Sequence, residues 1–154
     1  MSCFLALAAS LALADSYALP HAAPTEVSAL ASEPLYAEIV GRARALKADV
    51  EALEALPGLK AAPGVVAADR LRALAPGAEM LAKLDMKGHY DLEARKRDGD
   101  LKCILKGVSE DLPRKLAEVQ AATTGAQEFA ALGELAYLLD DNVGVITAPP
   151  KPAV

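Results

Sequence analysis

The chain has 154 residues and a formal net charge of −5, and 53% of its residues are hydrophobic but only 4% are aromatic. This length fits one domain, and the acidic balance argues against a protein that wraps nucleic acid, because such proteins need a basic face to neutralise phosphates. Alanine inflates the apolar fraction, which favours closely packed helices over a β-sandwich, whose strands need β-branched and aromatic residues.

The first 18 residues have the pattern of an export signal. An uncharged apolar run over residues 3–14 is followed by small-residue sites at 12–14 (ALA) and 16–18 (SYA). The run is too short to span a bilayer, and with these sites it is typical of a signal peptide. No Lys or Arg precedes it, so either the true start lies upstream or the run is the second half of a bipartite presequence. The alternative is an alanine-rich first helix that stays in the protein.

Residues 19–31 contain two prolines and predict an extended lead-in to the folded part. A first helix is expected over residues 32–56, with Ser32 as N-cap and Pro34 in the first turn. Pro-Gly pairs at 57–58, 63–64 and 76–77 are turn signals, so we expect the middle of the chain to be short helical pieces at 65–74 and 78–85. The stripe expected to be buried in the first helix is Leu35, Ile39, Ala43, Leu46, Val50 and Leu53.

Two longer helices are expected in the second half. One begins near Asp91 and either continues through a kink at Pro113, which we favour, or ends there before a new helix. The other opens with a capping box formed by Thr124 and Gln127. Residues 147–154 hold three prolines and predict a flexible tail. Residues 32–146 therefore predict an all-α, up-and-down four-helix bundle with short irregular helical segments in the middle. The stripe expected to be buried in the last helix is Phe129, Leu132, Leu135, Ala136, Leu139 and Val143.

The chain offers few residues for a metal or cofactor site. His89 is expected in a surface loop, and a haem held by His89 and Met80 or Met86 is the minor alternative. The sequence DGD at 98–100 begins like a calcium loop, but its twelfth position is Ser109 rather than the glutamate that an EF-hand needs. We therefore expect no metal and no cofactor.

Catalytic residues are also scarce. Removal of Cys3 with the export segment would leave Cys103 single, which excludes a structural disulfide. Cys103 lies in an apolar-periodic helix, where a cysteine usually behaves as a small buried hydrophobe. The acidic pairs at 110–111 and 140–141 are interpreted as solvated charge. We expect a protein that is not an enzyme and has no small-molecule substrate.

One basic cluster stands out, although Glu93, Asp98 and Asp100 interrupt it. The simplest interpretation is a solvated helix face. The functional alternative is a docking patch for an acidic protein surface, where such charges act mainly on orientation and association rate. No aromatic residues interleave with the basic ones, so nucleic acid is not the expected partner. The cluster consists of Arg95, Lys96, Arg97, Lys102 and Lys106.

Residues 100–146 contain DLKCILKGVSEDLPRKL and, after a short gap at TTGA, LGELAYLLDDNVGVI. This stretch resembles the last two helices of the PsbQ-type extrinsic proteins of photosystem II, particularly the divergent forms of red-lineage algae, and ADRLRALAPG at 68–77 fits the same pattern. The resemblance covers about a third of the chain. Two features depart from the family pattern: the chloroplast-targeting front half is missing, and Pro-Gly-bounded segments stand in place of a regular second helix.

The resemblance implies a four-helix bundle in the thylakoid lumen that docks on the photosystem II core or its other extrinsic subunits. Such proteins help to retain the calcium and chloride that water oxidation needs and have no catalytic site, and residues 1–18 would be a thylakoid-transfer segment. From the residues alone, a periplasmic helical adaptor or chaperone-like protein of a bacterium fits equally well. An enzyme or cofactor carrier is the third alternative.

Overall fold

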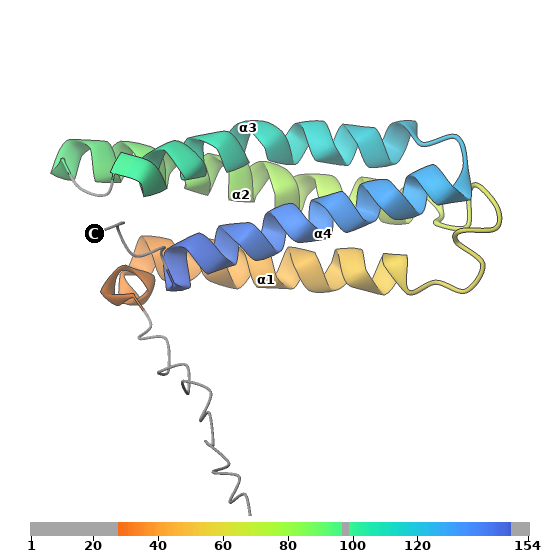
Figure 1. Cartoon of the computed structure of the whole chain (residues 1–154), viewed down its shortest axis with the longest axis horizontal. Coiled ribbons are helices and arrows are strands. Elements are labelled where there is room, and N and C mark those ends of the chain that lie inside the picture. Colours follow the sequence, from red (N-terminus) through yellow and green to blue (C-terminus); the bar gives the residue numbers. More distant parts are fainter. Residues whose placement is uncertain (1–27, 97–98, 149–154) are drawn as a thin grey trace, which may run out of the picture.

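The computed structural model describes residues 28–96 and 99–148, which form four long helices and one short 3-10 helix (Figure 1). The described part contains no strand, so the predicted all-α four-helix bundle is confirmed. Successive helices run in opposite directions, as the prediction of an up-and-down bundle requires (Figure 1). The elements are η1 (Ala29–Ser32), α1 (Pro34–Glu54), α2 (Ala68–Arg95), α3 (Gly99–Ala121) and α4 (Gly125–Thr147).

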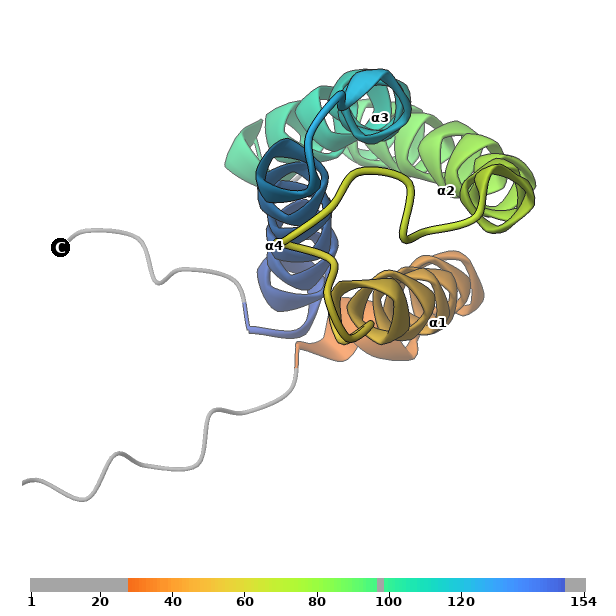
Figure 2. The same ribbon diagram turned by 90° about the vertical axis from the view of Figure 1, so that its right-hand side faces the viewer.

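Each long helix packs on two neighbours. α1 contacts α2 and α4, and α3 contacts α2 and α4, so α2 and α4 face each other across the diagonal of the bundle (Figure 2). None of the helices within residues 28–96 and 99–148 combines the length and apolarity that crossing a membrane would require. The core between the helices consists mainly of leucine, valine and alanine.

The buried stripe of α1 agrees with the sequence pattern at five of its six positions, Ile39, Ala43, Leu46, Val50 and Leu53. Leu35 is only half-buried, and Tyr36 is fully buried in its place. The predicted N-cap Ser32 is wrong, because Ser32 ends η1 and Glu33 occupies the N-cap position of α1.

The predicted short pieces in the middle of the chain are wrong. α2 is one continuous helix of 28 residues that passes through Pro76 and Gly77, and Asp91 lies near its end rather than at the start of the next helix. A proline inside a helix costs about 3 kcal/mol. Burying one leucine side chain contributes roughly 1.5–3 kcal/mol, and Leu71, Leu74 and Leu81 hold the apolar spacing on both sides of the proline. Burial therefore outweighs the local turn signal.

The irregular part of the chain lies instead at residues 55–67, where two of the predicted Pro-Gly turns occur. Gly58 and Gly64 adopt positive φ angles of 81° and 71°, which residues with a side chain rarely adopt. Leu59 and Val66 anchor this loop in the core. The loop lies against the start of α4, since a Cβ atom on Gly125 would come within 2.0 Å of the Leu59 carbonyl oxygen.

α3 is continuous through Pro113, which agrees with the continuous helix favoured from the sequence. It begins at Gly99, however, and not near Asp91. The predicted cap of α4 is confirmed, because the Thr124 hydroxyl accepts a hydrogen bond of 3.2 Å from the Gln127 backbone N–H. The reciprocal bond is shifted by one residue, since the Gln127 side-chain oxygen accepts from the backbone N–H of Thr123 at 3.2 Å.

The proposed export segment 1–18, residues 19–27 of the lead-in and residues 149–154 of the tail lie outside the described residues. The end of the lead-in is not extended, because residues 29–31 belong to η1 and Leu30 is buried. The Ser28 backbone N–H donates a 2.9 Å hydrogen bond to the Thr147 carbonyl, which joins the beginning of the described chain to the end of α4.

Candidate functional site

The basic cluster predicted from the sequence lies where α2 ends and α3 begins. Arg95 is the last residue of α2, and Lys96 is its C-cap in the left-handed conformation, with φ 53°. Lys102 and Lys106 lie on the first turns of α3, and Arg97 lies outside the described residues. The fold therefore brings four of the five basic residues to one end of the α2–α3 pair.

The Arg95 side chain reaches the start of α1 and is paired there, although it stays 37% exposed. Its guanidinium contacts the Glu33 carboxylate at 2.6 Å and the Asp91 carboxylate at 2.9 Å. The hydrogen bond to Glu33 is the main reason that the pKa of Arg95 lies above its usual value. Tyr36 completes this cluster by donating to Asp91 at 2.8 Å. Arg95 thus ties the end of α2 to the start of α1, and it is a weaker candidate for docking than the lysines.

The outer side of the α2–α3 pair carries an aromatic residue beside these lysines. Tyr90 is 60% exposed on α2, and Cys103 is exposed on α3. The pKa of Lys106 is raised first by its hydrogen bond to Glu110, and Tyr90 and Cys103 lie close enough to add to that shift. We refer to the set of Tyr90, Lys96, Lys102, Cys103 and Lys106 as the α2–α3 surface.

Two residues of this region differ from the sequence prediction. Cys103 is exposed and not a buried hydrophobe, because it lies opposite the apolar stripe that Leu101 and Leu105 define. His89 is not a loop residue but lies inside α2, where its side chain is only 13% exposed. Its Nδ1 lies 2.7 Å from the Lys102 carbonyl oxygen, and since a carbonyl only accepts, Nδ1 donates. His89 therefore joins α2 to α3.

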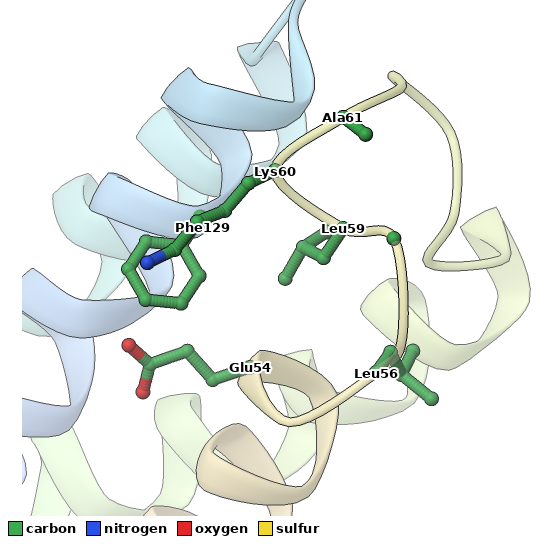
Figure 3. A pocket seen from close by; sticks show the side chains of 7 residues that line it. Glu54, Leu56, Leu59, Lys60, Ala61 and Phe129 are labelled. Carbon is green, nitrogen blue, oxygen red and sulfur yellow. The ribbon is translucent and has the colours of Figure 1, made fainter.

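A shallow pocket of about 250 Å³ lies at the opposite end of the bundle, between the 55–67 loop and α4 (Figure 3). The Lys60 ammonium lies 3.7 Å from the centre of the Phe129 ring, which is a cation–π contact that covers part of the pocket. Glu54 supplies the carboxylate of the lining. The remaining lining residues are apolar.

The sequence interpretation missed a buried polar pair. Asp85 of α2 and Asn142 of α4 are both 0% exposed, and the Asn142 amide nitrogen lies 3.2 and 3.0 Å from the two carboxylate oxygens of Asp85. Burial raises the pKa of Asp85 to about 7, although the hydrogen bond from Asn142 acts in the opposite direction. The spacing could have revealed both residues, because each continues the apolar stripe of its helix, Asp85 four residues after Leu81 and Asn142 three after Leu139.

The neighbouring acidic residues at 110–111 and 140–141 also contribute to salt bridges. Asp140 contacts Lys47 of α1 at 2.8 Å, and Asp111 contacts Arg114 at 2.8 Å. Within the described ranges, no three His, Cys, Asp or Glu side chains are grouped so that they could hold a metal ion. The α2–α3 surface is the candidate functional site, because it groups an exposed aromatic ring, lysines and an exposed thiol.

Comparison with known proteins adds no relative: no family model, no curated protein and no solved structure matches this chain.

Proposed function

We propose that this protein is a non-catalytic extrinsic subunit that docks on the lumenal side of photosystem II and supports the oxygen-evolving centre. The resemblance of residues 100–146 to PsbQ-type proteins implies a four-helix bundle, and the described chain folds as one. The continuous α2 also removes one departure from the family pattern, because no chain of short pieces replaces the second helix. Residues 1–18 would direct the chain into the lumen.

The observation that carries the docking role is the exposure of Tyr90 next to His89, whose bond to the Lys102 carbonyl holds this part of α2 against the lysine-bearing turns of α3. Tyrosine is enriched in protein interfaces because its ring buries a large area with little loss of side-chain entropy. Lysines around such an anchor orient the approach to an acidic partner. The whole chain carries a net charge of −5, so an acidic partner would repel most of the molecule and attract this surface. We expect the partner to present acidic residues opposite these lysines.

The experiment is co-sedimentation of the purified protein with salt-washed thylakoid membranes of a red-lineage alga. We expect binding at low salt that is lost at high salt, because surface charges are screened over a few ångströms in concentrated salt. Replacing Lys102→Glu and Lys106→Glu together should weaken binding by about tenfold or more, which corresponds to roughly 1.4 kcal/mol.

The matched control is Arg70→Glu with Arg72→Glu, which changes the same charge on exposed residues near the start of α2, at the other end of the helix. This control should bind as the unchanged protein does. Recovery of the unchanged protein only in the supernatant at low salt would contradict the proposal. Equal weakening by both double substitutions would show that net charge, and not the α2–α3 surface, governs binding.

A further inference from the structure

Asp85 and Asn142 form a polar contact across the diagonal of the bundle, between helices that do not otherwise pack on each other. Both side chains are fully buried. Gly88, one turn after Asp85, faces Leu105 of α3 and Ile39 of α1, so the walls of this part of the core are apolar. A charged carboxylate in such a place is costly unless it is well paired.

The hydrogen-bonding capacity of the pair is unbalanced. An ionised carboxylate only accepts hydrogen bonds, and the Asn142 amide nitrogen is its donor. The Asn142 side-chain oxygen is buried and has no partner. The pair therefore has more acceptors than donors, and one additional proton would correct the imbalance. A protonated Asp85 carboxyl supplies that donor, because its O–H can donate to the Asn142 oxygen once the amide turns toward it.

We propose that the Asp85–Asn142 pair is a proton-binding lock between α2 and α4, which closes when Asp85 takes up a proton from solvent and loosens when it releases one. In the closed form, the carboxyl O–H donates to the Asn142 oxygen, and the Asn142 amide donates to the carboxyl C=O. In the open form, a buried negative charge and an unpaired amide oxygen remain in the core. This inference does not depend on the proposed partner.

Other titratable groups near the pair are engaged elsewhere. On α1, the Tyr36 hydroxyl donates to Asp91, and burial is the first cause that keeps its pKa above the usual range. On α2 itself, His89 bonds to the Lys102 carbonyl. α3 presents Leu105 and Val108 to the core. On α4, Asp140 and Asp141 precede Asn142 but are exposed, and Asp140 pairs with Lys47 of α1 at 2.8 Å. The buried Glu128 lies at the other end of the helix, about 21 Å away at 1.5 Å per residue.

The direction of the pH effect follows from linkage. The pKa of Asp85 is about 7 in the folded chain, against a usual value of 3.8. Between these two values the folded state holds more protons than the unfolded state, so stability falls as the pH rises. At full effect the unfolding equilibrium constant would increase by as much as about a thousandfold between pH 4 and pH 8, which is the ratio of the two acid dissociation constants.

The test compares the unchanged protein with Asp85→Asn, which is always neutral and can donate to Asn142. Urea titrations between pH 4 and pH 8 give the unfolding equilibrium constant of each protein. The constant of the unchanged protein divided by that of Asp85→Asn should rise at least tenfold over this range. The control Asp49→Asn, at an exposed position of α1, should keep the pH dependence of the unchanged protein. A constant ratio for Asp85→Asn would overturn the inference.

A second measurement uses the unchanged chain alone, so it does not depend on whether the variant folds. The carboxyl carbon of Asp85, followed by NMR, should titrate with a midpoint near 7. The protection of the amides in the last turns of α4, measured relative to their base-catalysed intrinsic exchange rate, should fall above that midpoint. A titration midpoint below 5 would overturn the inference.

Discussion

The hydroxyl of Tyr36 on α1 donates a 2.8 Å hydrogen bond to the carboxylate of Asp91 on α2. Tyr36 is fully buried, and its ring also lies against the place where Gly88 lacks a side chain. Arg95 and Glu33 extend the contact to the surface through ion pairs. The start of α1 and the end of α2 are therefore held together by one polar cluster.

Removing the Tyr36 hydroxyl should weaken this junction. We expect Tyr36→Phe to lower the free energy of unfolding by about 1–2 kcal/mol, because Asp91 loses a donor at a partly buried position. Urea denaturation measures the effect. Tyr137→Phe is the matched control, since Tyr137 is 72% exposed and its change should stay within about 0.5 kcal/mol. Equal effects of the two changes would contradict a structural role for the Tyr36 hydroxyl.

Gly125 should not tolerate a side chain. A Cβ atom there would lie 2.0 Å from the Leu59 carbonyl oxygen and 2.6 Å from that of Ala62, both of which are backbone atoms. We expect Gly125→Ala to cost about 2–3 kcal/mol in unfolding free energy, because the 55–67 loop must move away from α4. Gly41→Ala is the control, since a Cβ atom at Gly41 meets nothing within 4 Å. It should stabilise α1 by about 0.5–1 kcal/mol, and a loss of stability there would contradict the packing described.

Pro76 offers a test of the continuity of α2. If the helix runs through this position, Pro76→Ala restores a backbone donor and removes a ring clash on an exposed face. The gain should be about 1–2 kcal/mol in unfolding free energy, since the unfolded chain also becomes more flexible. Thermal denaturation followed by circular dichroism measures it. A variant that is less stable would indicate that the proline holds a turn.

The buried pair should show strong non-additivity. Asn142→Leu alone leaves Asp85 without a partner in the core and should cost about 1–3 kcal/mol. Asp85→Leu combined with Asn142→Leu removes both polar groups and should be close to neutral, as is common when a buried polar pair is replaced by apolar residues. Urea denaturation of the two single variants and the double variant closes the cycle. Additive losses would contradict the pairing.

Helical periodicity predicted the bundle well, because most positions of the expected stripes are buried: five of six in α1, and Leu132, Leu135, Ala136 and Leu139 in α4. Local turn signals were misleading at Pro76-Gly77, where burial on both sides of the proline keeps the helix continuous. Asn142 takes the core position at which Val143 was expected. Its residue type alone does not predict burial, because the partner that binds it, Asp85, lies 57 residues earlier in the chain.

The candidate site was predicted only in part. The sequence located the lysines, but it could not show that Arg95 is bound to Glu33, 62 residues away, or that His89 holds this part of α2 against Lys102 of α3. Both relationships arise from the antiparallel packing of α2 on its neighbours. A linear cluster of basic residues therefore divides into one structural contact and one exposed surface.

Cross-linking from Cys103 tests the proposed docking most directly. Cys103 is exposed within the α2–α3 surface, so a photo-activated cross-linker on its thiol would report what touches that surface. In intact thylakoid membranes, we predict a specific adduct with a photosystem II subunit that disappears after a high-salt wash. The same linker on Cys103→Ser with Ala48→Cys, at an exposed position of α1, should give no such adduct. Adducts that are absent from Cys103, or equal from both positions, would contradict the account.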